Sequence, residues 1–213
     1  MDTATENKNT DGTQLDKQQI AEFGNQIWCT RVSRVNAEKR LKHKEAFAEE
    51  LNIYYSCFTV ILSISLFLIQ KEEVNRLFSA ISLTMTVVVT ICILYCKSLR
   101  YTDRARDYKS NYTELQQLEF SLKHIISMAE LKNIEDTYCK LLMGAENHIP
   151  YDYYKTILES NKSYKNKKDE KDLQQIRVKY DWGRCWRFAV EVFLVIIPVV
   201  VLISSYFAIK SHG

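Results

Sequence analysis

IYYSCFTVILSISLFLI, at residues 53–69, and LFSAISLTMTVVVTICILYC, at residues 77–96, are the two stretches that decide the fold. Neither contains a charged residue, and only the polar run QKEEVNR separates them. A helix rises about 1.5 Å per residue and the hydrocarbon core of a bilayer is about 30 Å thick, so the first run is just long enough to cross it and the second fits well. Two such runs in a chain of 213 residues leave too little protein to bury them, so we expect a transmembrane hairpin.

A third apolar run, FAVEVFLVIIPVVVLISSYFAI, occupies residues 188–209. It contains Pro198, which spanning helices tolerate and which is expected to kink this one. It also contains Glu191, about one turn inside the run, with Arg187 four residues earlier on the same face. We expect an interfacial carboxylate that reaches water and pairs with Arg187, whereas the alternative is a pore or gate residue.

The chain is otherwise densely charged and poor in residues that break helices, with only 5 glycines and 2 prolines. The predicted fold is therefore an all-α membrane protein, with a two-helix transmembrane hairpin, cytoplasmic helices and a third, C-terminal transmembrane helix. The expected segments are a disordered N-terminal lead at 1–19, a juxtamembrane helix at 20–52, the hairpin at 53–96, a cytoplasmic helical region at 97–160, a charged linker with a juxtamembrane helix at 161–187, and the third span at 188–209.

The distribution of Lys and Arg predicts the orientation of these spans. Residues 31–50 carry six of them and residues 97–109 carry five, whereas the turn of the hairpin carries only Lys71 and Arg76. Four precede the third run, at residues 177–187, and only Lys210 follows it. Because cytoplasmic flanks are enriched in these residues, the N-terminus is expected on the cytoplasmic side of the membrane and the C-terminus on the outer side, with Trp182, Trp186 and Tyr206 at the interfaces.

The helix that leads into the first span allows two interpretations. It combines apolar residues near helical spacing with many basic ones, so it could lie along the inner membrane surface with its cations facing anionic headgroups. It could equally be a stalk continuous with the first span. The basic residues predicted at the membrane surface are Arg31, Arg34, Lys39 and Arg40.

A short heptad pattern follows the hairpin. Leu115, Leu118, Leu122, Ile125 and Ala129 recur at alternating spacings of three and four. A pattern of about two heptads is weak evidence for a coiled coil between chains, so it favours packing within this chain.

Hydroxyl side chains form a stripe within the hairpin. Three lie on one face of the first span and four on one face of the second, again at spacings of three and four. Such residues allow helices to pack closely and hydrogen-bond to each other, or they line a wetted path for ions. Since three helices cannot enclose a useful pore, a channel requires an oligomer. The candidates for pore lining or helix packing are Ser56, Thr59, Ser63, Ser79, Ser82, Thr86 and Thr90, together with Glu191.

No pattern in the sequence requires catalysis. It contains no glycine-rich phosphate loop, nucleophile elbow or metalloprotease helix, and its four histidines are scattered. The six cysteines form no pair or cluster with zinc spacing. We therefore expect no catalytic residues, no metal and no cofactor. A net charge of only +3 does not indicate direct binding of nucleic acid.

Two further stretches resemble a known family. Trp28, Cys29, Thr30, Arg31, Arg34, Ala37, Glu38, Arg40 and Leu41, leading into Tyr54, Tyr55 and Ser56, are similar to the start of the bacterial SLATT domain, a two-helix membrane effector associated with second-messenger nucleotidyltransferases and SLOG sensor proteins. The run IEDTYCKLLMGAENHIPYDYYK resembles the helical cytoplasmic part of that family. Together these matches cover roughly residues 25–160, and the third span departs from the minimal two-helix pattern.

The resemblance implies an effector of an anti-phage, abortive-infection type of system, which oligomerises to form a pore or disrupt the inner membrane when a partner or signal activates it. It implies a nucleotidyltransferase, a SLOG protein or a reverse transcriptase as the partner, in addition to the lipid bilayer and further copies of the chain. The alternative is a non-conducting membrane anchor or sensor that recruits a cytoplasmic partner. A membrane enzyme is the third hypothesis, which no acid–base or metal constellation favours.

Overall fold

The computed structural model describes the backbone of residues 17–68, 72–163 and 170–211, and the side chains of 17–64, 72–160, 170–204 and Phe207. Every regular element in these residues is an α-helix, which confirms the all-α prediction. Residues 1–16 of the predicted lead, the end of the first predicted span with Lys71, and residues 164–169 of the predicted linker lie outside the described residues. The side chains of Tyr206 and Lys210 also lie outside them.

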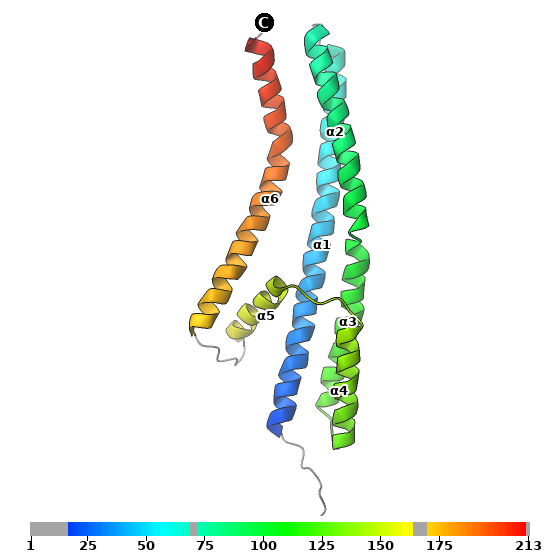
Figure 1. Cartoon of the computed structure of the whole chain (residues 1–213), viewed down its shortest axis with the longest axis vertical. Coiled ribbons are helices and arrows are strands. Elements are labelled where there is room, and N and C mark those ends of the chain that lie inside the picture. The colour runs from blue at the N-terminus through cyan, green and yellow to red at the C-terminus, as the bar shows by residue number, and fades with distance from the viewer. Residues whose placement is uncertain (1–16, 69–71, 164–169, 212–213) are drawn as a thin grey trace, which may run out of the picture.

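Two long helices set the dimensions of the molecule. Helix α1, Lys17–Leu68, has 52 residues and is therefore about 78 Å long, more than twice the thickness of a bilayer core. It runs without a break, as in the stalk interpretation of the basic segment. Helix α6, Glu170–Ser211, has 42 residues and begins inside the segment predicted to be a linker. Both rise from the lower to the upper end in Figure 1, where α6 also bends in the half that contains Pro198.

The chain descends beside α1 and then returns to α6. Helix α2, Glu72–Ser98, leads through Arg100 into α3, Tyr101–Leu122, and both pack along α1. Arg100 has a φ of 48°, a left-handed conformation that offsets the two helices slightly. Helix α4, Met128–Met143, then runs back upward beside α3. Helix α5, Pro150–Ser163, crosses from α1 to α6.

Local sequence explains where the shorter helices begin. Ser127 accepts a hydrogen bond from the backbone N–H of Glu130, and the Glu130 carboxylate accepts from the N–H of Ser127, a capping box that starts α4. Pro150 occupies the first position of α5, where no N–H is required. These starts position α4 and α5 against the lower half of α1.

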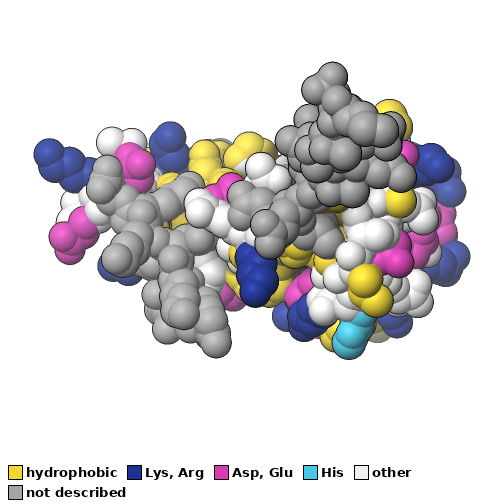
Figure 2. Space-filling view, turned by 90° about the horizontal axis from the view of Figure 1, so that it is seen from below, with side chains coloured by type: hydrophobic (Ala, Val, Ile, Leu, Met, Phe, Trp, Pro, Cys, Tyr) yellow, Lys and Arg dark blue, Asp and Glu magenta, His cyan; other side chains and the backbone are white. Residues whose placement is uncertain are grey.

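The lower half is a bundle with an ordinary core, which we call the polar bundle: the part of α1 before residue 50 together with α3, α4 and α5. Its core contains Leu115, Leu118 and Leu122 of the heptad pattern, packed on Ile27 and Tyr138. The pattern thus packs within the chain: Ile125, just after α3, also packs against this core, whereas Ala129 lies exposed on α4. Seen from below, this end mixes acidic and basic side chains (Figure 2).

Candidate functional site: an apolar belt and a buried polar junction

The upper half of the molecule turns its apolar side chains outward. We call this surface the apolar belt. It is formed by the exposed large side chains Ile53, Val60, Ile61 and Ile64 of α1, Leu77, Leu83, Val87, Val88, Ile91 and Leu94 of α2, and Phe193, Val195, Ile196, Val199, Val200, Ile203 and Phe207 of α6.

Two segments are long and apolar enough to cross a membrane, Glu72–Leu122 and Glu170–Ser204. Only 11% and 6% of their apolar windows are buried, so these are not core helices of a soluble protein. The end of the first predicted span lies outside the described residues. The hairpin and third span of the sequence analysis therefore correspond to two candidate spans, and the crossing by α1 stays a prediction.

Within the belt, α1 and α2 pack through a small apolar cluster. Phe58, Leu62 and Phe78 are buried there, and Leu202 of α6 touches the same cluster. Beside it, the hydroxyl oxygens of Ser63 and Ser82 lie 3.3 Å apart and form a hydrogen bond between the two helices. Ser82 is only 8% exposed, which corresponds to the helix-packing role of a small hydroxyl residue.

The other stripe residues are not brought together. Thr59, Thr86 and Thr90 donate to carbonyl oxygens of their own helices, Ser63 does so in addition to its contact with Ser82, and Ser79 lies 3.4 Å from the Asn75 amide oxygen. Ser56, Ser79, Thr86 and Thr90 are exposed. A single chain therefore offers one packing contact and an outward-facing set of hydroxyls on α2.

Helix α6 is attached to α1 by two tyrosines that the sequence analysis did not single out for this role. The Tyr55 hydroxyl donates to the carbonyl of Leu194 at 2.8 Å, and the Tyr54 hydroxyl donates to that of Val195 at 3.2 Å. Leu194 lies four residues before Pro198, whose missing N–H would otherwise leave that carbonyl without a helical partner. The position of the proline is the signal that could have revealed this contact.

Glu191 does not form the expected pair with Arg187. Its carboxylate lies 3.2 Å from His43 Nε2 on α1, and its side chain is 30% exposed. The Arg187 guanidinium instead stacks on Tyr151 of α5, 3.8 Å from the ring centre, and donates to the carbonyl of Gly183. The predicted Arg187–Glu191 pair was wrong because each side chain contacts a neighbouring helix instead. Spacing along a single helix does not reveal such contacts.

Most of the predicted membrane-surface cations face inward. Arg31 pairs with Glu119 of α3 at 2.9 Å, and Arg34 is fully buried, donating to the carbonyl of Leu141. Arg40 forms a bidentate pair with Asp152, with N–O distances of 2.9 and 3.0 Å. These three side chains are not available to headgroups in this conformation, and only Lys39 remains exposed.

These inward contacts form a buried polar junction, consisting of Arg40 and Asp152 with Ser33, Asn36 and Thr156. The Thr156 hydroxyl lies 3.1 Å from both the Ser33 hydroxyl and the Asn36 amide nitrogen, so α5 is bonded to α1 at several points. Asp152 is 1% exposed and Thr156 is fully buried. Ser33, Asn36 and Arg40 recur at spacings of three and four, a polar seam that could have been recognised in the sequence.

Burial also affects the ionisation of this region. Burial lowers the pKa of the Arg34 guanidinium, and the nearby Tyr108 and Tyr138 raise that pKa to a smaller extent. It likewise lowers the pKa of His148, which follows α4 and lies near Asp152 and Arg34. Since a guanidinium remains charged even with a lowered pKa, Arg34 is a buried positive charge inside the polar bundle.

In the part of the chain that the structure describes, no three His, Cys, Asp or Glu side chains are placed to hold a metal ion. The six cysteines there form no disulfide. A polar hollow of about 250 Å³ lies beside Arg104 and Glu146, which pair at 2.6 Å.

The outward apolar belt above a charged helical bundle defines a helical membrane protein, because such an amount of exposed apolar surface requires lipid or another protein to cover it. Residues 16–204 match the SMODS and SLOG-associating 2TM effector domain family 5, so the chain belongs to this family of membrane effector domains. The resemblance seen in the sequence is thereby confirmed. No curated protein and no solved structure matches the chain.

The two stretches that carried the resemblance lie against each other. Thr30, Arg34 and Arg40 from the first contact Tyr138, Leu141 and Asp152 from the second, through the hydrogen bonds of the polar bundle. Residues of both stretches therefore bond α1 to α4 and α5 within the polar bundle.

Proposed function

We propose that this chain is the membrane effector of a bacterial anti-phage system of the abortive-infection type. The apolar belt inserts into the inner membrane, and copies of the chain associate there to form a pore or to disrupt the bilayer when a partner or signal activates them. The observation that carries the proposal is the belt itself, with only 11% and 6% of its two candidate windows buried, in a chain of the 2TM effector family.

The proposed orientation places the polar bundle in the cytoplasm. It rests on the excess of Lys and Arg in residues 31–50 and 97–109 over the turn between α1 and α2. In this orientation α1, α2 and α6 all cross the bilayer. The bundle is then the part that receives the signal, from a nucleotidyltransferase, a SLOG protein or a reverse transcriptase, since SMODS and SLOG domains give the family its name.

Association between copies is proposed because one chain cannot enclose a path for ions. Thr86 and Thr90 lie exposed on α2 and donate along their own helix, so their oxygens face outward from the hairpin. In an oligomer these oxygens meet at the contacts between chains. They can then line a wetted path that a hydrophobic constriction closes in the resting state.

The test is induced expression with the partner genes in a bacterial host carrying a membrane-potential dye. Thr86→Val and Thr90→Val together keep the side-chain shape and remove both hydroxyls from the stripe. Thr84→Val is the matched control, because Thr84 is also exposed on α2 and also donates along its helix, but lies on another face. We expect wild type and control to depolarise the membrane, and the double variant to do so several-fold more slowly.

One observation favours a second candidate function, a non-conducting anchor. The threonine hydroxyls of the belt already donate to backbone carbonyls, as they do on helices that face only lipid. An anchor would leave the membrane potential intact under every activating partner and would still retain that partner in the membrane fraction. That outcome contradicts the effector proposal and supports the anchor.

A further inference from the structure

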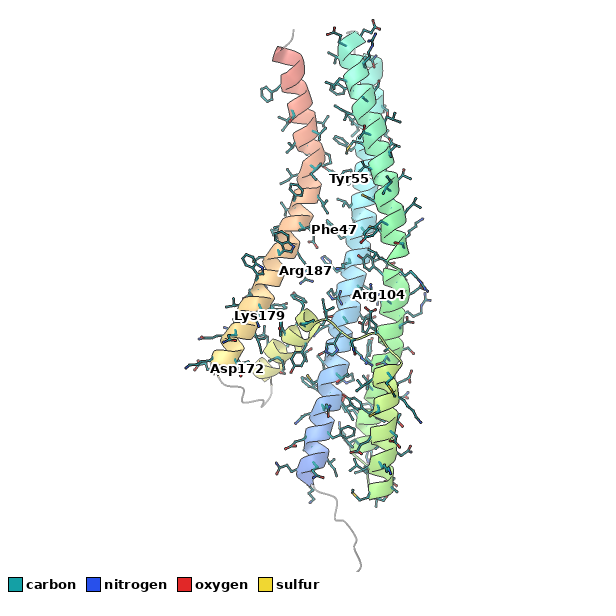
Figure 3. The ribbon with its side chains drawn as sticks, viewed as in Figure 1. Phe47, Tyr55, Arg104, Asp172, Lys179 and Arg187 are labelled. Carbon is teal, nitrogen blue, oxygen red and sulfur yellow. The ribbon has the colours of Figure 1, made fainter. Side chains whose placement is uncertain are left out.

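An apolar recess lies where the belt meets the polar bundle. Phe47 of α1 and Val192, Val195 and Ile196 of α6 line a hollow of about 220 Å³, together with Glu191, whose carboxylate exposes no polar surface to the hollow. This carboxylate is already hydrogen-bonded to His43. Figure 3 shows Phe47 between α1 and α6, with Tyr55 above it and Arg187 below. The recess is therefore apolar toward the belt and bordered by polar groups toward the bundle.

Two cations without an acidic partner lie one helical turn below this recess. They are Lys44, three residues before Phe47 on α1, and Arg187, four residues before Glu191 on α6. Lys44 lies 5.8 Å from the Tyr101 ring centre, and Arg187 lies over the ring of Tyr151. Among the described residues neither forms an ion pair. The cluster of cations around Lys44 also contains Arg40 and Arg104, which pair with Asp152 and Glu146.

The charge of this cluster is not balanced from within the chain. Partial burial lowers the pKa of the Lys44 ammonium, and repulsion from Arg40, Arg187 and Arg104 lowers it further, against a weaker opposing effect of Asp152. Cations gathered from α1, α3 and α6 thus destabilise each other. A bound anion between Lys44 and Arg187 would relieve that repulsion.

In the proposed orientation, Lys44 and Arg187 lie at the level of the lipid headgroups. Trp182 and Trp186, on the same stretch of α6 as Arg187, are 75% and 65% exposed. Tryptophan gathers at the interface between water and hydrocarbon, so these rings mark the level of the lipid headgroups. The recess above them then lies at the level of the acyl chains.

We propose that the junction of α1 and α6 binds one anionic phospholipid, with its phosphate on Lys44 and Arg187 and an acyl chain in the recess beside Phe47 and Val195. The proposal rests on the membrane insertion proposed above, but not on conduction. Such a lipid would join α1 to α6, which otherwise touch through few side chains at this level. The site thereby makes the resting arrangement of the helices depend on lipid composition.

The experiment is native mass spectrometry of the full chain in a neutral detergent, titrated with phosphatidylglycerol or phosphatidylcholine. We expect one phosphatidylglycerol per chain to bind preferentially. Lys44→Gln should weaken this binding about 5-fold, and Lys44→Gln with Arg187→Gln about 30-fold, since each cation at an anionic surface contributes about 1 kcal/mol. Lys44→Arg should preserve the binding.

The matched control is Lys39→Gln with Lys179→Gln, which removes the same charge from exposed positions of the same two helices. It should bind phosphatidylglycerol as the wild type does, whereas Val195→Trp should fill the recess and lose it. Equal loss in the control, equal binding of phosphatidylcholine, or a lipid-free dimer covering the recess would overturn the proposal. Lys44→Gln alone keeps the test valid if Arg187→Gln disturbs the stacking on Tyr151. Lost lipid binding with normal depolarisation would leave the proposed function standing.

Discussion

Arg40 and Asp152 are the residues on which the attachment of α5 most depends. Their side chains are 8% and 1% exposed, and their geometry is bidentate. Removing one partner of a buried pair leaves an uncompensated charge, which costs about 3–5 kcal/mol. We therefore predict that Arg40→Gln lowers the melting temperature of the detergent-solubilised chain by about 10 °C, as measured by the loss of helical circular dichroism.

Arg106→Gln is the control for this prediction. Arg106 lies 3.7 Å from Asp103 in the same bundle, but its side chain is 73% exposed. Exposed pairs contribute at most about 1 kcal/mol, so this variant should melt close to wild type. A similar loss in both variants would show that Arg40 acts only through general charge.

The residue scale is also where sequence analysis was least successful, and for a physical reason. Arg34 was predicted to face lipid headgroups, yet it lies seven residues from both Ile27 and Leu41, on the buried face of α1. This heptad spacing could have predicted that Arg34 lies on the buried face of α1. The partner of Arg40 could not be predicted from the sequence, because Asp152 is 112 positions away and only the fold brings the two residues together.

At the scale of helices, the apolar runs and the heptad leucines were predictable because periodicity and length alone determine them. The continuity of α1 was not, since the sequence allowed either a stalk or a surface helix. Lys44 and Arg187, the two cations without acidic partners, were visible only as members of a charge count. Their convergence depends on how α1 and α6 are placed, which the spacing within each helix does not determine.

The attachment of α6 to α1 leads to a prediction about Tyr55. Its hydroxyl satisfies the Leu194 carbonyl that Pro198 leaves free, so Tyr55→Phe should leave an unpaired acceptor in the belt. Such a loss costs about 1–3 kcal/mol, and we expect a melting temperature lower by several degrees. Tyr54→Phe should cost less, because Val199 keeps the N–H that the Val195 carbonyl can use.

A double-mutant cycle separates this mechanism from a loss of packing. Pro198→Ala restores an N–H four residues after Leu194, so that carbonyl no longer needs the tyrosine. Tyr55→Phe should then cost less in the Pro198→Ala background than in wild type. If its cost is the same in both backgrounds, the hydrogen bond does not compensate for the proline.

At the scale of the whole molecule, α1 is a single rod of about 78 Å, of which a bilayer core would cover about 30 Å in the proposed orientation. The remainder carries the polar bundle, so a displacement of α5 on α1 occurs on the same helix that enters the belt. Helix α5 also contacts α6, through Arg187 and Tyr151. Helix α3 of the bundle also continues from α2. The bundle is thus connected to all three helices proposed to cross the membrane, which is the arrangement required if a signal received there is to change the belt.

The number of crossings leads to the last prediction. Three spans place the two termini on opposite sides of the membrane, whereas two spans place them on the same side. With the polar bundle in the cytoplasm, alkaline phosphatase fused after Gly213 should be active and green fluorescent protein fused there should be dark. Fusions truncated after Gly144, between α4 and α5, should show the reverse. A bright fluorescent protein at Gly213 would mean that α6 does not cross, and its exposed apolar side chains, from Phe193 to Phe207, would then need a protein partner to cover them.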